Sequence, residues 1–202
     1  MTSWDERFRK GEYPLDPDPA PILQRYVDVF PDGRALDIAT GTGRNAVFLA
    51  AQGYTVDALD TSREGLTIAR ENAAKRGIED RCSWIHADAF EYSYPEAAYD
   101  VITIQSFQVI ERLTDIKAAL APGGVLYYKA HLRASEPLDY GPSDRHRLGA
   151  NELLRACLDL NVLHYREYTT GESDHRGAYA QVIARKSTGH TQSLPHSQIF
   201  GE

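Results

Sequence analysis

The sequence is short of several features that would assign a protein to a class at once. Only two of its 202 residues are cysteines, Cys82 and Cys157, and their separation matches no metal-binding spacing, so we expect two reduced thiols. No run of about 18 apolar residues occurs, which argues against a transmembrane helix. Residues 1–7 lack the basic-then-apolar layout of a signal peptide. We therefore expect a cytoplasmic protein that does not associate with membranes.

Basic residues are also in short supply. The chain has 22 Lys and Arg against 29 Asp and Glu, a formal net charge of -7. Nucleic-acid binding depends on Lys and Arg that neutralise phosphates, so we expect no nucleic-acid partner. The 42% hydrophobic content is ordinary for a globular protein, and the length suits one domain. We expect a soluble monomer or homodimer with a small-molecule substrate.

Apolar runs alternate with helical patterns through most of the chain. Strands are expected at 34–39, 54–59, 81–86, 99–105 and 125–130, and helices at 20–30, 44–52, 61–76 and 108–120. Such alternation is typical of βαβ units and a parallel sheet. Near the end, a helix at 151–158 precedes strands at 162–168 and 178–186, which we expect to pair antiparallel. The pattern predicts an α/β fold: a Rossmann-like, doubly wound, seven-stranded mixed sheet with an antiparallel C-terminal strand.

The domain organisation follows from where this pattern begins and ends. We expect a single domain over residues 1–186, in which 1–19 form an N-terminal arm and 132–149 a long polar loop. Residues 187–202 contain few apolar side chains and are expected to be a flexible tail. Four of the histidines, His164, His175, His190 and His196, show no ligand spacing, so no metal site is expected.

Residues 35–45 hold the most informative pattern, a short strand, a turn with two glycines, and the start of a helix. Glycines allow a backbone to approach a ligand closely and to adopt positive φ. The start of the helix offers free N–H groups to an anionic group. Asp60 ends the next strand, 17 residues after Gly43, where an acid commonly accepts hydrogen bonds from ribose hydroxyls. The third glycine of the dinucleotide fingerprint is missing, since position 46 is alanine.

Further features appear in a fixed order along the chain. Asp37 lies inside the first strand, Asp88 follows the third, Asp100 opens the fourth, and the Pro-Gly-Gly turn 122–124 precedes the fifth. With the turn at 36–43 and Asp60, this order resembles the class I S-adenosylmethionine-dependent methyltransferases over residues 34–130, and more loosely to 186. Residues 43–46 and 4–8 also resemble the subgroup related to tellurite-resistance and thiol methyltransferases.

The resemblance implies a cofactor, S-adenosylmethionine, and a set of residues around it. Asp60 would bind the ribose, Asp88 the adenine amino group, and Gln105 would lie beside the reacting sulfonium. Asp37 would sit near the ammonium of the methionine part. The full cofactor-side set is Asp37, Gly41, Gly43, Arg44, Asn45, Asp60, Thr61, Asp88, Ala89, Phe90 and Gln105. Many members of this family have glycine where this chain has Ala39, so we expect the turn to pass through ordinary dihedral angles there.

Candidate residues on the substrate side are fewer. Arg7 and Tyr13, with Trp4, would form a lid over the cofactor; the alternative is an arm packed on the domain surface. His131 follows the fifth strand and is a candidate base, or a polar residue that merely ends the strand. Arg145 and His146 would grip an anionic acceptor, or belong to a solvated basic loop.

The function predicted from these patterns is in-line methyl transfer from S-adenosylmethionine to a small acceptor. Because the sulfonium is already a good leaving group, alignment in a dry site can suffice, and no catalytic residue is assigned. Two alternatives stay open: a nicotinamide-dependent oxidoreductase of Rossmann type, and a non-catalytic protein that binds S-adenosylmethionine.

Overall fold

Seven strands form one sheet whose central members are buried on both faces. The computed structural model describes residues 3–134, 138, 141–170 and 177–189. The strands are β1 (Arg34–Ile38), β2 (Thr55–Asp60), β3 (Cys82–His86), β4 (Tyr99–Gln105), β5 (Leu120–His131), β6 (Asn161–Thr170) and β7 (Gly177–Arg185). Their order in the sheet is β3-β2-β1-β4-β5-β7-β6. β7 runs antiparallel to both of its neighbours, β5 and β6, and the other adjacent strands are parallel, which confirms the predicted mixed sheet.

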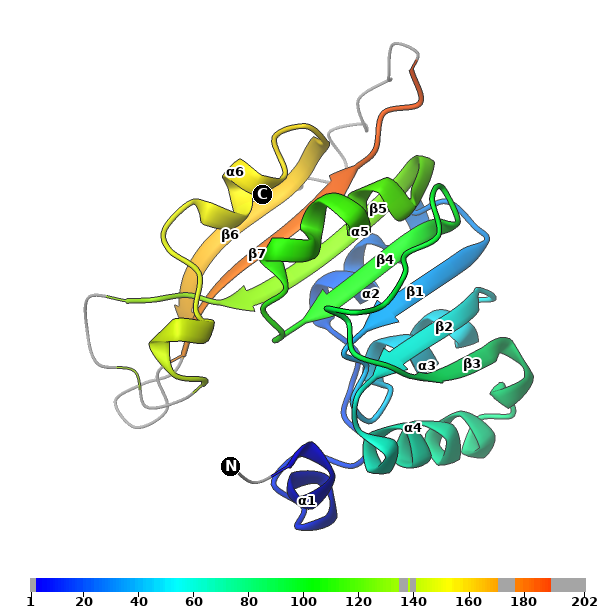
Figure 1. Ribbon diagram of the computed structural model, residues 1–202. Helices are drawn as coiled ribbons and strands as arrows, with labels where there is room; N and C mark the ends of the chain where they lie inside the picture. The colour runs from blue at the N-terminus through cyan, green and yellow to red at the C-terminus, as the bar shows by residue number, and fades with distance from the viewer. Residues whose placement is uncertain (1–2, 135–137, 139–140, 171–176, 190–202) are drawn as a thin grey trace.

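Helices cover both faces of this sheet (Figure 1). They are α1 (Trp4–Arg9), α2 (Pro21–Tyr26), α3 (Arg44–Ala51), α4 (Arg63–Lys75), α5 (Leu113–Ala119) and α6 (Glu152–Ala156). Single 3₁₀ turns occur at Val27–Val29, Glu79–Arg81, Ile110–Arg112 and Asp144–His146. One hydrophobic cluster joins α5 and α6 to one face, and a second joins α2 and α3 to the other, where α4 packs beside α3.

Two elements differ from the sequence prediction. The helix expected at 108–120 begins only at Leu113, because residues 110–112 form a 3₁₀ turn first. The strand expected at 125–130 starts at Leu120, so the Pro-Gly-Gly segment lies inside β5, where the register with β4 shifts. Glycine is needed at 124 because a Cβ there would lie 2.9 Å from the carbonyl oxygen of Ala121.

The helix expected at 61–76 begins two residues later than predicted, at Arg63. Residues 61–64 have a capping-box pattern, but the residue that caps the helix is Ser62, whose Oγ accepts a hydrogen bond from the N–H of Gly65. Thr61 is exposed and lies one residue before the cap. The N–H of Glu64, which a cap at Thr61 would accept, donates to Asp5 instead, and Ser62 accepts the next N–H.

The carboxyl ends of β1, β2, β3, β4 and β5 all meet at one edge of the sheet, as in other parallel sheets. Figure 1 shows α1 beyond these strand ends, beside α4. The loop after β5 returns to the same edge, where Leu132 and Leu148 form an isolated bridge. This edge therefore gathers the glycine turn, the arm and the loop, and it is where a ligand site is expected.

Candidate functional site

A buried carboxylate anchors the glycine turn. Asp37 is only 2% exposed, and its two oxygens accept hydrogen bonds from the hydroxyls of Thr40 (2.6 Å) and Thr103 (2.5 Å). Burial raises the pKa of Asp37 to about 6, although these two hydrogen bonds oppose the shift. Asp37 thus ties the turn after β1 to β4 from inside the protein, and its expected position near a ligand ammonium stays a prediction.

The backbone of the turn departs from the prediction at Ala39. Its φ is +56°, in the left-handed region, so the expectation of ordinary dihedral angles at this alanine was wrong. Gly41 (φ +55°) and Gly43 (φ +85°) also lie in that region. At Gly43 a Cβ would come within 2.8 Å of the Cβ of Ala69 in α4. The turn is held by its neighbours tightly enough to impose an unfavourable conformation on Ala39.

Asp60 faces this turn from the end of β2. Its Oδ2 accepts from the N–H of Gly41 and its Oδ1 from the N–H of Ser62, both at 2.8 Å. Burial raises the pKa of Asp60, and the backbone N–H groups hold it down in part. A carboxylate has about four lone-pair sites, so two bonds leave it able to accept from two more donors.

Asp88 lies at the next strand end, after β3. The side chain is exposed, and Oδ1 accepts from the N–H of Phe90 (2.9 Å). The ring of Phe90 is 42% exposed and meets that of Phe107 edge-on, with centroids 5.9 Å apart, whereas Ala89 is buried. An acceptor carboxylate beside an accessible aromatic ring is suited to a flat base that carries an amino group.

The N-terminal arm reaches the same turn. A Cβ on Gly41 would lie 3.4 Å from the ring of Phe8, which is buried there. Asp5 fixes the arm to the start of α4, since its Oδ1 accepts from Ser62 Oγ (2.6 Å) and from the N–H of Glu64 (3.1 Å). The predicted lid residues cluster together, because the guanidinium of Arg7 lies 5.2 Å from the centre of the Tyr13 ring. The arm therefore covers the glycine turn.

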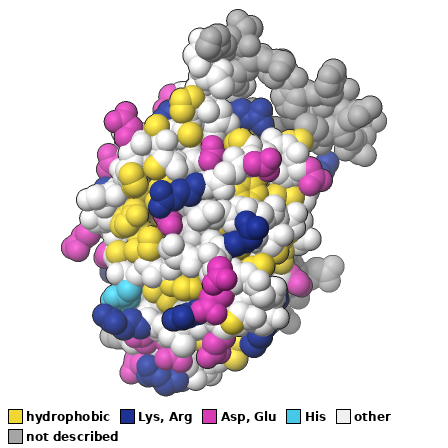
Figure 2. Space-filling model, turned by 90° about the vertical axis from the view of Figure 1, so that its right-hand side faces the viewer, with side chains coloured by type: hydrophobic (Ala, Val, Ile, Leu, Met, Phe, Trp, Pro, Cys, Tyr) yellow, Lys and Arg dark blue, Asp and Glu magenta, His cyan; other side chains and the backbone are white. Residues whose placement is uncertain are grey.

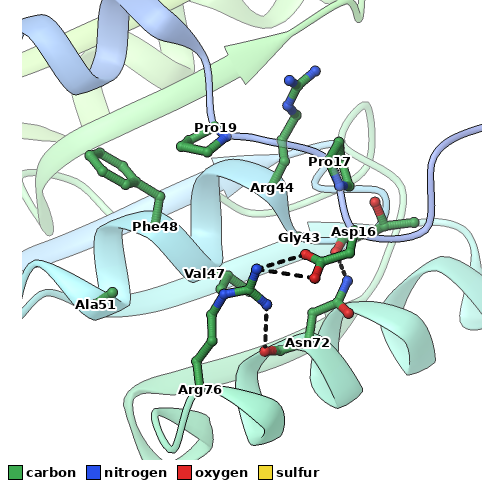
Figure 3. A pocket seen from close by; sticks show the side chains of 11 residues that line it. Asp16, Pro17, Pro19, Gly43, Arg44, Val47, Phe48, Ala51, Asn72 and Arg76 are labelled. Atoms are coloured by element: carbon green, nitrogen blue, oxygen red, sulfur yellow. Dashed lines mark hydrogen bonds and ion pairs between the residues drawn. The ribbon is translucent and has the colours of Figure 1, made fainter.

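A strap formed by residues 14–20 connects this arm to α2 and crosses the ends of α3 and α4 (Figure 3). Arg76, the residue that follows α4, bonds to both carboxylate oxygens of Asp16, at 2.9 and 3.1 Å. Asn72 donates to the carbonyl of Leu15 (2.7 Å), and Arg44 to that of Asp18. A cavity of about 130 Å³ lies between the strap and the two helices. Arg44 therefore holds the strap.

Gln105, at the end of β4, connects α3, the helix that follows the glycine turn, to the neighbouring strand β5. Its Oε1 accepts from Asn45 Nδ2 (3.2 Å) and from the hydroxyl of Tyr127 (3.3 Å). Asn45 is itself buried, and its Oδ1 accepts from the N–H of Ala20. Of the predicted cofactor-side residues, Asn45 and Arg44 therefore bond to the strap. Gly41 belongs to the glycine turn, Asp60 bonds to it, and Asp88 lies after the neighbouring strand.

A second cavity, of about 210 Å³, opens beside Gln105 on the side away from Asp60 and Asp88. Its lining comes from the start of α2 and from four strands: Ala20, Pro21, Ile22, Gln105, Tyr127, Lys129, Arg166, Tyr168 and Gln181. Lys129, Arg166, Tyr168 and Gln181 were not among the predicted site residues. The one available signal was Lys129, a lysine within an apolar strand.

The predicted substrate residues near β5 differ in exposure: His131 is buried, whereas Arg145 and His146 are exposed. His131 is 7% exposed and packs on Tyr179, and burial together with Arg147 and Lys129 lowers its pKa to about 4. It is neutral at pH 7, but a pKa so far below neutral makes it a weak general base. Arg145 and His146 are exposed and bond to each other (3.0 Å). The buried member of this basic run is Arg147, which donates to the carbonyls of Leu132 and Pro142.

Other classes of site find little support in the described part of the chain. Within those residues no group of three or more His, Cys, Asp or Glu side chains is placed to hold a metal ion. Among the same residues no helix has the length and apolar content needed to cross a bilayer. On the face shown in Figure 2, Lys and Arg are interspersed with Asp and Glu, and they form no continuous basic surface there.

Comparison with known proteins agrees with this geometry. Residues 35–124 match the model of the methyltransferase domain family. A demethylmenaquinone methyltransferase of Thermus thermophilus is 40% identical over 100 residues, which are 46% of this chain and 44% of that protein. A ribosomal protein uL3 glutamine methyltransferase of Bordetella pertussis is 44% identical over 72 residues, 34% of this chain and 24% of that protein. The chain thus spans less than half the length of these curated relatives.

The fold has close counterparts among solved structures. That of TehB from Haemophilus influenzae superposes with a TM-score of 0.73 at 19% identity, covering 91% of this chain and 66% of that one. At this identity the likeness shows the fold alone. The methyl acceptors named for the two curated relatives, a demethylmenaquinone and a ribosomal protein, belong to different classes. Similarity therefore leaves the acceptor to be argued from this chain's own residues.

Proposed function

Because the chain carries the methyltransferase domain and the fold of the class I S-adenosylmethionine-dependent methyltransferases, we propose that it transfers a methyl group in line from S-adenosylmethionine to a small-molecule acceptor. The observation that carries this proposal is the pair of carboxylates, Asp60 and Asp88, at neighbouring strand ends beside a glycine turn. The adenosyl group of S-adenosylmethionine presents two ribose hydroxyls and one amino group as donors, which is the set that two carboxylates can accept.

The residues present fit this cofactor in their chemistry. Asp60 keeps acceptor capacity for ribose hydroxyls after its two backbone bonds. Asp88 would take the adenine amino group, and the exposed face of Phe90 would stack on the ring. When bound, S-adenosylmethionine supplies an electrophilic methyl group on a sulfonium.

The protein's part in the reaction is mainly alignment. The lone pair of the acceptor atom forms a bond to the methyl carbon, while the carbon–sulfur bond breaks and its electron pair stays on sulfur. Gln105 is held by Asn45 and Tyr127, which fixes its amide between the glycine turn and the second cavity. His131 is neutral at pH 7, but its lowered pKa makes it a weaker base than a free imidazole, so no proton transfer is assigned to it. Holding both partners in line accounts for most of the acceleration that such a site can give.

The N-terminal arm acts as a lid in this proposal. Phe8 lies over Gly41, so α1 must shift to admit the methionine part of the cofactor. The strap at 14–20 stays in place because α3 and α4 bond to it, whereas α1 depends on Asp5. Replacing Asp5 with alanine should raise the hydrogen-exchange rate of residues 4–9 and speed cofactor association. Unchanged exchange and unchanged association would show that the arm is a fixed surface element.

The alternative of a nicotinamide-dependent oxidoreductase is less well supported. Position 46, where the dinucleotide fingerprint needs a glycine, is a fully buried alanine. The resemblance also gives Asp88 the role of accepting the adenine amino group, which the dinucleotide fingerprint does not require. A protein that binds S-adenosylmethionine without catalysis would share the same cofactor site, so only product formation separates it from an enzyme.

Isothermal titration tests the proposal directly. S-adenosylhomocysteine, the demethylated product, should bind with a sub-millimolar dissociation constant, and NADH should not compete with it. The absence of binding by both S-adenosylmethionine and its product at that level would contradict the proposal. Binding of NADH with quenching of the cofactor fluorescence would favour the oxidoreductase instead.

A further inference from the structure

We propose that the cavity beside Gln105 binds the methyl acceptor and that this acceptor is a small organic anion with a carboxylate group. The inference rests on the proposed function, because it assigns the partner of the methyl transfer. Its basis is a row of polar side chains across four strands, the charge that this row carries, and the apolar wall that faces it.

The row is set by the register of the sheet. Gln105 of β4 pairs with Lys129 of β5, Lys129 pairs with Gln181 of β7, and Gln181 pairs with Arg166 of β6. Residues that pair across neighbouring strands point to the same face, so all four side chains lie in one line. All four line the 210 Å³ cavity, and Gln105 stands at the end nearest the glycine turn.

The cavity is positively charged in a protein that is acidic overall. Lys129 and Arg166 line it, and no acidic side chain does, although the chain carries a net charge of -7. Within the described residues, neither cation forms an ion pair with a carboxylate. Lys129 Nζ lies 4.0 Å from the centre of the Tyr179 ring, and the Arg166 guanidinium lies 4.4 Å from that of Tyr168.

These aromatic partners leave the cations able to bind an anion. A ring face stabilises a cation but accepts no directed hydrogen bond comparable to that of a carboxylate. Burial and the nearby Arg44 lower the pKa of Lys129, and no carboxylate that lines the cavity opposes this shift. A bound carboxylate would supply that charge and would accept hydrogen bonds from Lys129 and Arg166.

The opposite wall limits what else the acceptor can be. Ala20, Pro21 and Ile22 at the start of α2 face the polar row, with the rings of Tyr127 and Tyr168 at its sides. These groups favour a hydrocarbon or aromatic body attached to the anionic group. The cavity volume of about 210 Å³ is below the roughly 300 to 1,000 Å³ typical of pockets for drug-sized ligands, so the body must be small.

Binding of matched probes tests the inference. Benzoate and its neutral isostere benzamide are titrated into the full chain by calorimetry, with and without S-adenosylhomocysteine. Benzoate should bind at least about 10-fold more tightly than benzamide, since one charge-assisted hydrogen bond contributes about that much. Lys129→Gln and Arg166→Gln should each weaken benzoate binding about 10-fold and leave benzamide unchanged.

A matched control separates the site from general charge effects. Arg155 lies on α6, across the sheet from the cavity, and donates to the carbonyl of Ala150. Arg155→Gln makes the same change in net charge and should leave benzoate binding within about 2-fold of the original protein. Thermal melting of each variant confirms that it folds, and Lys129→Arg, which keeps the charge, should retain most of the affinity for benzoate.

The outcomes distinguish this inference from the proposed function. Tight binding of S-adenosylhomocysteine without preference for benzoate over benzamide would overturn the anionic acceptor and leave the methyltransferase proposal intact. A benzoate preference that Arg155→Gln removes as strongly as Lys129→Gln would overturn the location. Benzoate binding that depends on Lys129, in a protein that binds neither S-adenosylmethionine nor its product, would uphold an anion site but contradict the proposed function.

Discussion

The two halves of the sheet's carboxyl edge differ in charge and in the way they are held. On the β1–β2–β3 side, Asp37 and Asp60 are bound by hydroxyls and backbone N–H groups close to them. On the β5–β7–β6 side, Lys129 and Arg166 stand against tyrosine rings. Gln105 lies at the boundary and bonds to both sides. An acidic half suits a cofactor with hydroxyl, amino and sulfonium groups, and a basic half suits an anionic acceptor.

The difference teaches how opposite charges can meet at one reaction site. A sulfonium is positive, and an acceptor anion next to it is attracted directly. Because the two halves bind groups of opposite sign, each ligand should be excluded from the other's place by like-charge repulsion. Substitutions confined to one half should therefore affect one ligand and spare the other.

Of the substitutions considered, removal of the Asp60 carboxylate should have the largest effect, because it should abolish most of the cofactor affinity of the acidic half. Asp60→Ala loses the proposed acceptor of two ribose hydroxyls and should weaken binding of S-adenosylhomocysteine at least about 100-fold, with benzoate binding unchanged. Calorimetry measures both. Asp80→Ala, at an exposed acid that precedes β3 at the opposite end of that strand from the site, is the control and should leave both affinities in place. An Asp60→Ala variant with near-normal cofactor affinity would refute the donor site.

The positive charge of the basic half should affect how the free energy of unfolding depends on pH, through His131. Burial, Arg147 and Lys129 lower the pKa of His131 from 6.5 to about 4. Between pH 6.5 and 4, His131 binds a proton in the unfolded chain but stays neutral in the folded chain. The free energy of unfolding therefore falls as the pH falls. Asp37, whose pKa is raised to about 6, acts in the opposite sense over pH 3.8 to 6.

His131→Gln removes one of these two opposing effects. When the pH is lowered from 6.5 to 4, the free energy of unfolding of the variant should fall by on the order of 2 to 3 kcal/mol less than that of the original protein. Urea denaturation at a series of pH values measures the difference. Parallel stability curves for the two proteins would mean that His131 titrates normally and that its environment is neither dry nor positively charged.

The anchor beneath the glycine turn offers a smaller effect. Thr103→Val preserves shape but removes the hydroxyl that bonds to Asp37, and should cost about 1.5 to 3 kcal/mol in the free energy of unfolding. Thr55→Val, at an exposed position at the start of β2, is the matched control and should change stability by less than about 0.5 kcal/mol. Equal changes in the two variants would show that the buried carboxylate does not anchor the turn.

The smallest predicted effect is a change in stability when the strained alanine of the glycine turn, Ala39, is replaced. Ala39 has a φ of +56°, which costs about 1 to 2 kcal/mol for a residue with a Cβ. Ala39→Gly removes that strain but adds freedom to the unfolded chain, so the net stabilisation should be about 0.5 to 1 kcal/mol. A higher melting temperature is expected. A destabilised variant would indicate that the alanine methyl group makes packing contacts that outweigh the strain.

The acidic half could be predicted from sequence because its parts lie close together along the chain. The strand, turn and helix at 35–45 are consecutive, and Asp60 and Asp88 each end or follow a recognisable strand. The seven-stranded mixed sheet and its antiparallel last strand were also predicted. The prediction failed at Ala39, where packing around the turn overrides the local preference of alanine.

The basic half was beyond sequence reasoning for a physical reason. Lys129 and Arg166 are brought together only because β7 lies between β5 and β6, an order that reverses the order in the chain. The register that aligns them with Gln181 depends on two antiparallel pairings. In the same way, the basic run 145–147 was noticed, but only the fold shows that Arg147 is its buried member.

A crystal structure with S-adenosylhomocysteine bound is the most direct test that the two halves serve one reaction. We predict ribose hydroxyls on Asp60, adenine beside Asp88 and Phe90, Phe8 displaced from Gly41, and the sulfur directed past Gln105 into the cavity lined by Lys129. A sulfur directed away from that cavity, or a nucleoside bound elsewhere with Asp60 and Asp88 untouched, would contradict it.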